Sequence, residues 1–167
     1  TYTNIDVENE DYFRKTNWTI KEYADLLKNS QENLQKEGWS APFLENHDQP
    51  RSVNKLIKDS NYYTEGAKAL AVMNLLLRGT PMIYQGEELG TLNFKRTSID
   101  QFDDVNARSQ YDQAIANGFT PEQALQFLNE RSRDNARTPF AWTNQKYGGF
   151  SDATPWIAMS YENPVLN

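Results

Sequence analysis

Cysteine is absent from this sequence of 167 residues, and histidine occurs only once. Without cysteine the chain forms no disulfide and no thiolate metal site, and a single histidine rules out a multi-histidine metal cluster. We therefore expect no metal and no cofactor, and any chemistry must use carboxylates, arginines or hydroxyls. The lack of cysteine suits a cytoplasmic protein, which is the location we expect, although many secreted bacterial enzymes also lack cysteine.

Long apolar runs and an excess of basic residues are also lacking. No apolar run reaches the roughly 20 residues that a membrane span needs. The chain has 17 basic and 23 acidic residues, a formal net charge of -6, and no basic stripe that could neutralise phosphates. Neither a membrane nor nucleic acid is therefore expected as a partner. The remaining composition, 38% hydrophobic and 13% aromatic, is typical of one soluble globular domain.

The two ends of the sequence indicate that it is part of something longer. The chain begins at Thr1 without an initiator methionine or a leader, and it stops at Asn167 in mid-sequence. We expect a piece cut from a longer protein.

Helical and extended patterns alternate in the first half of the chain. Residues 19–38 open on a Thr-x-x-Glu capping box and continue with apolar residues at helical spacing, which predicts an amphipathic helix. Residues 64–78 are apolar nearly all round, as in a buried helix covered on both faces. Apolar stretches at 39–44, where Pro42 indicates irregularity, and at 81–84 predict two strands, each followed by polar residues. This alternation indicates an α/β fold with parallel strands and a site at their C-terminal ends.

The second half departs from this alternation. Residues 104–117 predict a helix, and a second helix begins after Thr120, with Pro121 at its first position. Residues 131–156 lack periodicity and are rich in Arg, Asn, Thr, Gly and aromatic residues, a composition typical of an ordered loop.

His47 and Asp48 are the first candidates for chemistry, because they lie in a sharp turn after the first predicted strand and before Pro50. An imidazole and a carboxylate side by side can hold adjacent hydroxyls of a sugar. The alternative is a structural turn in which Asp48 bonds the local backbone. Arg51 is most simply a surface or ion-pair arginine.

Arginines around an aspartate form the second candidate cluster, in the non-periodic tail. Arg133 and Arg137 flank Asp134, and either they hold the long loop through ion pairs or one of them faces a ligand. Other polar and aromatic candidates have structural interpretations that we favour, as loop residues or as packing beneath a loop. They are Gln85, Glu87, Glu88, Trp39, Trp142, Trp156, Phe140 and Phe150.

Three motifs in order resemble the α-amylase superfamily (glycoside hydrolase family 13). Residues 43–51 (FLENHDQPR) resemble its fourth conserved region, and residues 79–90 (GTPMIYQGEELG) resemble the next helix-to-strand passage. Residues 133–139 (RDNARTP) are similar to a stretch typical of oligo-1,6-glucosidases, dextran glucosidases and trehalose-6-phosphate hydrolases. The resemblance covers about residues 15 to 160.

The resemblance implies that residues 1–167 are the C-terminal portion of a glycoside hydrolase catalytic domain. The expected fold is an α/β, incomplete (β/α)8 TIM barrel fragment with about strands 7 and 8, their helices and a long helical loop after strand 8. A closed barrel of this kind needs about 250 residues, so this chain cannot close it. We expect apolar surface to remain exposed and the fragment to self-associate through it.

The implied parent enzyme is a retaining, exo-acting α-glucosidase that hydrolyses α-1,6-glucosidic bonds at the non-reducing ends of isomalto-oligosaccharides. Such enzymes use an aspartate nucleophile and a glutamic acid acid-base about 5 to 5.5 Å apart. By the resemblance both lie on earlier strands, so we expect the chain alone to be inactive. Asp48 would stabilise the transition state as the third carboxylate, while His47 and Arg133 would bind the substrate.

Two departures from the family pattern leave linkage and leaving-group preference open. The sequence has Asp104-Val105-Asn106 where these glucosidases commonly have Asp-Val-Glu, and Phe140-Ala141-Trp142 in place of Met-Gln-Trp. The alternatives are a trehalose-6-phosphate hydrolase, an α-1,4-glucosidase, a non-catalytic barrel-like relative, or a generic α/β binding domain without a sugar site.

Overall fold

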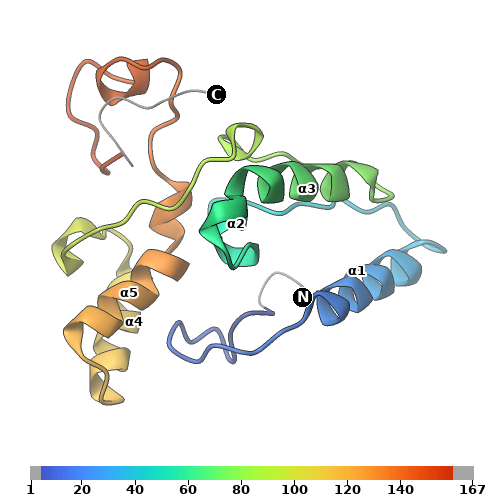
Figure 1. The fold of residues 1–167 in the computed structure, drawn as a ribbon, viewed down its shortest axis with the longest axis horizontal. Coiled ribbons are helices and arrows are strands. Elements are labelled where there is room, and N and C mark those ends of the chain that lie inside the picture. Colours follow the sequence, from blue (N-terminus) through green and yellow to red (C-terminus); the bar gives the residue numbers. More distant parts are fainter. Residues whose placement is uncertain (1–4, 160–167) are drawn as a thin grey trace.

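The computed structural model describes residues 5–159, which form helices joined by extended segments and loops (Figure 1). The α-helices are α1 (Ile20–Leu34), α2 (Ser52–Leu56), α3 (Tyr63–Leu76), α4 (Val105–Ala116) and α5 (Pro121–Arg131). The short 3-10 helices are η2 (Ser60–Tyr62), η3 (Glu87–Leu89), η4 (Ile99–Gln101), η5 (Arg133–Ala136) and η6 (Lys146–Gly149). None of the described helices is both long and apolar enough to cross a membrane.

The predicted helices form, and local capping explains where they begin. Thr19 and Glu22 make the reciprocal capping box of α1, with the Glu22 N–H donating to the Thr19 hydroxyl at 3.2 Å. Thr120 caps α5 in the same way, with Pro121 at its first position, where a missing N–H costs nothing. The prediction of helices at both places is confirmed, although α2 has too short a pattern to be recognised from the sequence.

The two predicted strands are extended segments rather than regular β-strands. Thr80 N–H donates to the Ser40 carbonyl at 2.8 Å, and Met82 N–H donates to the Pro42 carbonyl at 2.9 Å. Both partners advance in the same direction, so the segments run parallel. Pro42 has no N–H with which to donate to the second segment, so both of these hydrogen bonds run from N–H groups of the second segment to carbonyls of the first. The described residues therefore contain no β-strand, which corrects the prediction of strands at 39–44 and 81–84.

Gly79 allows the two segments to approach closely. Its φ is +143°, and a Cβ at this position would lie 2.4 Å from the Ser40 carbonyl oxygen. A side chain would therefore push the segments apart, just where the first of their two hydrogen bonds forms.

Two small hydrophobic cores lie within the described chain. In one, Leu44 of the first extended segment packs with Val53 of α2 and Leu70 of α3. In the other, Phe102 and Leu128 pack between α4 and α5, which lie side by side (Figure 1). The first core sets the first extended segment against α2 and α3, and the second packs α4 and α5 together.

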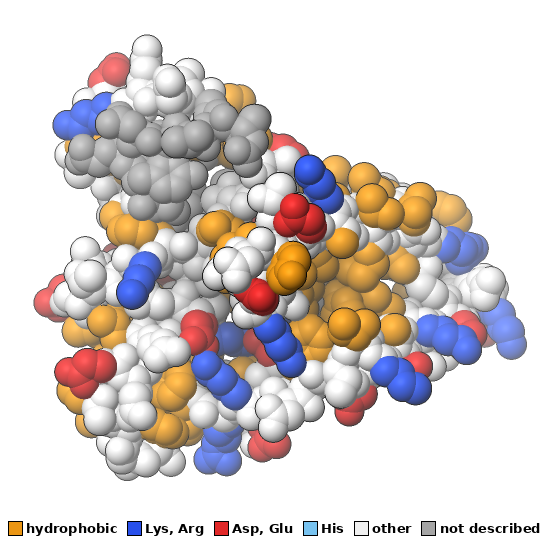
Figure 2. Space-filling view, viewed as in Figure 1, with side chains coloured by type: hydrophobic (Ala, Val, Ile, Leu, Met, Phe, Trp, Pro, Cys, Tyr) orange, Lys and Arg blue, Asp and Glu red, His pale blue; other side chains and the backbone are white. Residues whose placement is uncertain are grey.

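One face of α3 is uncovered, as expected for this helix in a barrel fragment, although its composition alone is that of a helix covered on both faces. Leu75 and Leu76 are exposed, with 80% of Leu76 accessible, and Met82 and Ile83 of the second extended segment are exposed as well. Figure 2 shows hydrophobic side chains gathered over this side of the molecule. The described residues form no closed barrel, and their apolar surface remains exposed, as expected for a barrel fragment.

Candidate functional site

A buried carboxylate fixes the loop that carries His47 and Asp48. One oxygen of Glu45 accepts from the backbone N–H and the hydroxyl of Ser52, at 2.7 and 2.8 Å, and the other accepts from Arg51 at 2.9 Å. The loop thus closes on itself between Glu45 and Ser52. Arg51 is buried in this ion pair, which confirms its interpretation as an ion-pair arginine.

Within this loop the chain turns sharply and presents two polar side chains. The Asn46 side chain accepts from the Asp48 N–H at 2.8 Å, a side-chain turn that reverses the backbone locally. His47 and Asp48 are 70% and 47% exposed, and His47 Nε2 lies 3.2 Å from Asp48 Oδ2. The turn uses the Asp48 N–H, while the Asp48 carboxylate bonds groups from other parts of the chain.

Arg133 reaches the same place from the opposite side. It begins η5, directly after α5, and the Ser132 hydroxyl caps this turn through the Asp134 N–H. The buried Asp134 carboxylate accepts from the N–H groups of Asp103 and Asp104, at 2.9 and 3.1 Å. The start of η5 is therefore tied to the start of α4.

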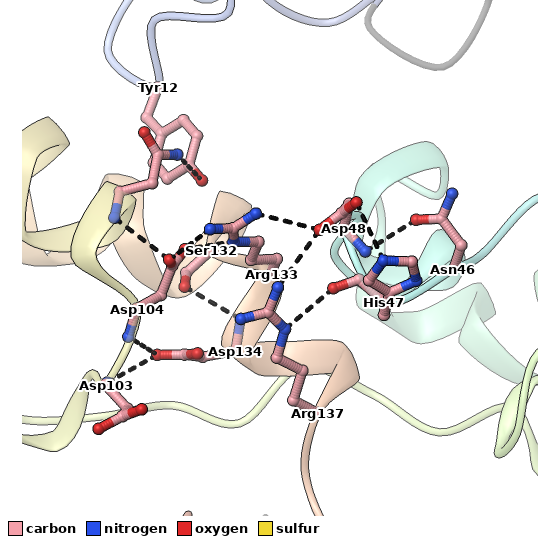
Figure 3. A network of polar contacts seen from close by, with 11 residues as sticks. Tyr12, Asn46, His47, Asp48, Asp103, Asp104, Ser132, Arg133, Asp134 and Arg137 are labelled. Atoms are coloured by element: carbon pink, nitrogen blue, oxygen red, sulfur yellow. Dashed lines mark hydrogen bonds and ion pairs between the residues drawn. The ribbon is translucent and has the colours of Figure 1, made fainter.

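The Arg133 guanidinium lies between two carboxylates (Figure 3). It donates to Asp104 from Nε at 2.7 Å and from Nη2 at 2.8 Å, and its Nη1 donates to Asp48 at 3.1 Å. Burial acts to raise the pKa of Asp104, but the bonds from Arg133 and from the Asn106 N–H outweigh it, so that this pKa lies below its ordinary value. The hydrogen bonds to Asp104 also raise the pKa of Arg133, so the guanidinium remains charged.

Arg137 completes the cluster. Its Nε donates to the His47 carbonyl at 3.1 Å and its Nη2 donates to Asp48 at 3.2 Å. The interpretation of Arg137 as a loop-holding arginine fits this geometry. The structure thus brings His47, Asp48 and Arg133 together in one cluster.

A cavity of about 350 Å³ opens beside this cluster. Its lining is mostly polar and comes from four separate parts of the chain: Asn9, Glu10, Tyr12, Asp48, Gln49, Pro50, Asn106, Gln110, Arg131 and Arg133. Tyr12 accepts from the Asn106 side chain at 3.1 Å, so the N-terminal segment forms one wall. Tyr12 and Gln110 have no local sequence signal that would have marked them, because only the tertiary fold brings them here.

The polar residues after the second extended segment bond the local backbone. Glu87 accepts from the Tyr84 N–H at 3.0 Å, and Glu88 accepts from the Gly86 N–H at 2.8 Å. Burial raises the pKa of Glu87 to about 7, although the Tyr84 amide opposes that rise. These contacts fit the structural interpretation of the pair.

Most of the aromatic candidates are exposed, which corrects the interpretation that they pack beneath a loop. Trp39, Trp142, Phe150 and Trp156 are all exposed. Trp39 still donates to the Thr80 hydroxyl at 2.9 Å, and the rings of Phe140 and Trp142 lie 4.6 Å apart. Among residues 5–159, no group of three or more His, Cys, Asp or Glu side chains is placed to hold a metal ion.

Comparison with known proteins relates this geometry to one family. The chain is 42% identical, over 148 residues, to the probable oligo-1,6-glucosidase 3 of Bacillus subtilis (strain 168), covering 89% of this chain and 27% of that protein. It is 41% identical, over 130 residues, to the trehalose-6-phosphate hydrolase of the same organism, covering 78% of this chain and 23% of that protein. The chain thus spans about a quarter of the length of these curated relatives.

Solved structures give the same result. An isomaltulose synthase variant from Erwinia rhapontici NX5, in complex with D-glucose, superposes with a TM-score of 0.85 at 36% identity, covering 93% of this chain and 28% of that one. The isomaltulose synthase of Protaminobacter rubrum superposes with a TM-score of 0.84 at 34% identity, covering 94% and 28%. The family model described as "Alpha amylase, catalytic domain" matches residues 1–166. The chain therefore belongs to the α-amylase catalytic domain family.

Proposed function

We propose that this chain is the C-terminal part of the catalytic barrel of a retaining, exo-acting α-glucosidase. The complete enzyme would release glucose from the non-reducing ends of isomalto-oligosaccharides by cleaving α-1,6 bonds. Support comes from the oligo-1,6-glucosidases among the relatives, including that of Halalkalibacterium halodurans at 40% identity over 155 residues.

The observation that carries the proposal is the convergence on Asp48. His47, Arg133 and Arg137 all lie within 3.2 Å of its carboxylate oxygens, and the carboxylate borders a polar cavity. As a glucosyl ring flattens toward an oxocarbenium ion, positive charge develops at its anomeric carbon. A carboxylate held in place beside that ring stabilises the transition state more than the ground state.

The residues of the cluster then have distinct roles. Asp48 grips the hydroxyls of the glucosyl unit and stabilises the developing charge, His47 hydrogen-bonds the same unit, and Arg133 binds its non-reducing end. Arg133 is well suited to this because its bonds to Asp104 hold the guanidinium while part of it remains accessible. The nucleophile and the acid-base would come from the part of the barrel that precedes this chain.

Because the proposal places the nucleophile and the acid-base outside this chain, we expect the isolated chain to be inactive. The 167-residue chain should not hydrolyse isomaltose or p-nitrophenyl α-glucoside above background. Turnover that persists through repurification would mean that the catalytic pair lies within this chain, and the assignment of roles would be wrong.

Two other activities have specific support among the comparisons. The relationship to a trehalose-6-phosphate hydrolase favours a phosphorylated disaccharide, and the superposition on isomaltulose synthases favours isomerisation of sucrose. We favour the glucosidase because oligo-1,6-glucosidases from several organisms match most of the chain.

The experiment that separates these activities is a substrate panel on the complete enzyme. Isomaltose, isomaltotriose, maltose, trehalose 6-phosphate and sucrose would be compared by kcat/KM and by product analysis. The proposal predicts the highest kcat/KM for the two isomalto-oligosaccharides, with glucose as product. A preference for trehalose 6-phosphate, or isomaltulose formed from sucrose, would replace it with the corresponding alternative.

A further inference from the structure

The guanidinium of Arg137 spans two successive residues of the loop that carries the candidate site. It bonds the backbone carbonyl of His47 through Nε and the carboxylate of Asp48 through Nη2. We propose that Arg137 is a positioning residue for the glucoside site, one that fixes the orientation of His47 and Asp48 without binding the sugar itself. This inference rests on the proposed function, which assigns the glucosyl unit to His47 and Asp48.

Arg137 differs from Arg133 in what it holds. Arg133 bonds only the carboxylate of Asp48 and has a separate anchor in Asp104. Arg137 bonds a backbone carbonyl and the next side chain together (Figure 3). Because the N–H groups of a guanidinium lie in one rigid plane, making both bonds fixes the angle between the His47 peptide and the Asp48 carboxylate. A lysine ammonium, with its compact charge on a flexible stem, does not impose that angle.

The backbone that carries Arg137 is itself held in place. The buried Ala136 accepts a hydrogen bond at its carbonyl from the Tyr84 hydroxyl at 3.2 Å, and Arg137 N–H donates to the Asp134 carbonyl at 3.3 Å. Tyr84 ends the second extended segment, whereas His47 and Asp48 follow the first. Arg137 therefore links the end of the second extended segment, through Tyr84, to the loop that follows the first segment and carries His47 and Asp48.

His47 provides a direct test in the isolated chain, because it is the single histidine and its imidazole NMR signals need no assignment. Arg137→Lys and Arg137→Gln would be compared with wild type. The matched control is Arg78→Lys, since Arg78 also donates to a backbone carbonyl, that of Gly38, but after α3. We expect the His47 signals to shift and broaden in both Arg137 variants and to stay unchanged in Arg78→Lys. Thermal melts would verify that each variant is folded. Arg137→Lys is the smaller change of the two, because lysine keeps the positive charge.

Kinetics of the complete enzyme on isomaltose provide the second readout. Because misplacement of a catalytic group by about 1 Å can cost 10²-fold, Arg137→Lys should lower kcat by about 10-fold to 10²-fold. In an Asp48→Asn background, Arg137→Lys should lower kcat by a much smaller factor, because the Asp48 carboxylate through which Arg137 acts is already absent. Arg78→Lys should retain the wild-type kcat.

The outcomes separate the two claims. Unchanged His47 signals together with an unchanged kcat in Arg137→Lys would overturn the positioning role while leaving the glucosidase proposal intact. Full additivity with Asp48→Asn would also overturn it, because Arg137 would then act independently of Asp48. If the His47 signals move but the wild-type enzyme cleaves no glucoside, Arg137 does position the loop, and the proposed function is what fails.

Discussion

The carboxylate of Asp104 accepts two hydrogen bonds from the Arg133 guanidinium, at 2.7 and 2.8 Å, while also capping α4 through the Asn106 N–H at 3.2 Å. One side chain thus determines both where α4 begins and where Arg133 points. The anchor is nearly buried, with 2% of the Asp104 side chain exposed, whereas Arg133 remains partly accessible. The position of Arg133 beside Asp48 therefore depends on residues that are far from Asp48 in the sequence.

Replacing Asp104 by asparagine should weaken this anchor without removing the helix cap, because asparagine caps helices as well as aspartate does. Hydrogen bonds to charged groups contribute about 1.5 to 3 kcal/mol. We expect Asp104→Asn to lower the free energy of unfolding by roughly 1 to 3 kcal/mol in urea titrations. Asp103→Asn makes the same chemical change at an exposed neighbour and should cost much less. Equal losses in the two variants would contradict the anchoring role.

The raised pKa of Glu87 predicts a pH dependence of stability. Burial raises this pKa from 4.5 to about 7, so between these values the native state retains a proton that the unfolded state has released. Unfolding then becomes easier as pH rises across this window. The free energy of unfolding should fall from pH 4.5 to 7 more steeply in wild type than in Glu87→Gln. Glu88→Gln should retain most of the wild-type slope, and parallel profiles for wild type and Glu87→Gln would refute the prediction.

The sequence predicts local structure well where the signal is local. Capping boxes at Thr19 and Thr120 define the start of α1 and α5, and the motif around His47 and Asp48 identifies one half of the candidate site. The rest depends on the tertiary fold. The apolar pattern of residues 39–44 indicates a strand, but Pro42 prevents a regular hydrogen-bond ladder there. Nothing near Asp104 in the sequence indicates that its carboxylate anchors Arg133.

The exposed face of α3 agrees with the expectation for a barrel fragment, although the composition of this helix alone indicates a buried one. Its composition indicates a helix covered on all sides, and composition is a sound guide when the covering elements are present. In the described residues only Gly66, Leu70 and Asn74 of this helix are buried.

The exposed face of α3 should make the chain associate with itself. Sedimentation velocity should show an apparent mass that rises with concentration, because Leu76 and its apolar neighbours remain in water in the monomer. Leu76→Glu should reduce this association. Val105→Glu is the matched control, since Val105 is also 80% exposed but lies on α4, away from this face (Figure 1). A monodisperse monomer at all concentrations would contradict the prediction.

The most direct test of the role assigned to Asp48 is the turnover of an Asp48→Asn variant of the complete enzyme on isomaltose, measured alongside its thermal melt. Asparagine keeps the shape of the side chain but removes the charge that opposes the oxocarbenium ion. By analogy with the loss of one preorganised electrostatic contact, kcat should fall by at least about 10² to 10³, or roughly 3 to 4 kcal/mol, with a much smaller change in KM. A variant that melts at a lower temperature but keeps the wild-type kcat per folded molecule would show that Asp48 serves only the structure of its turn.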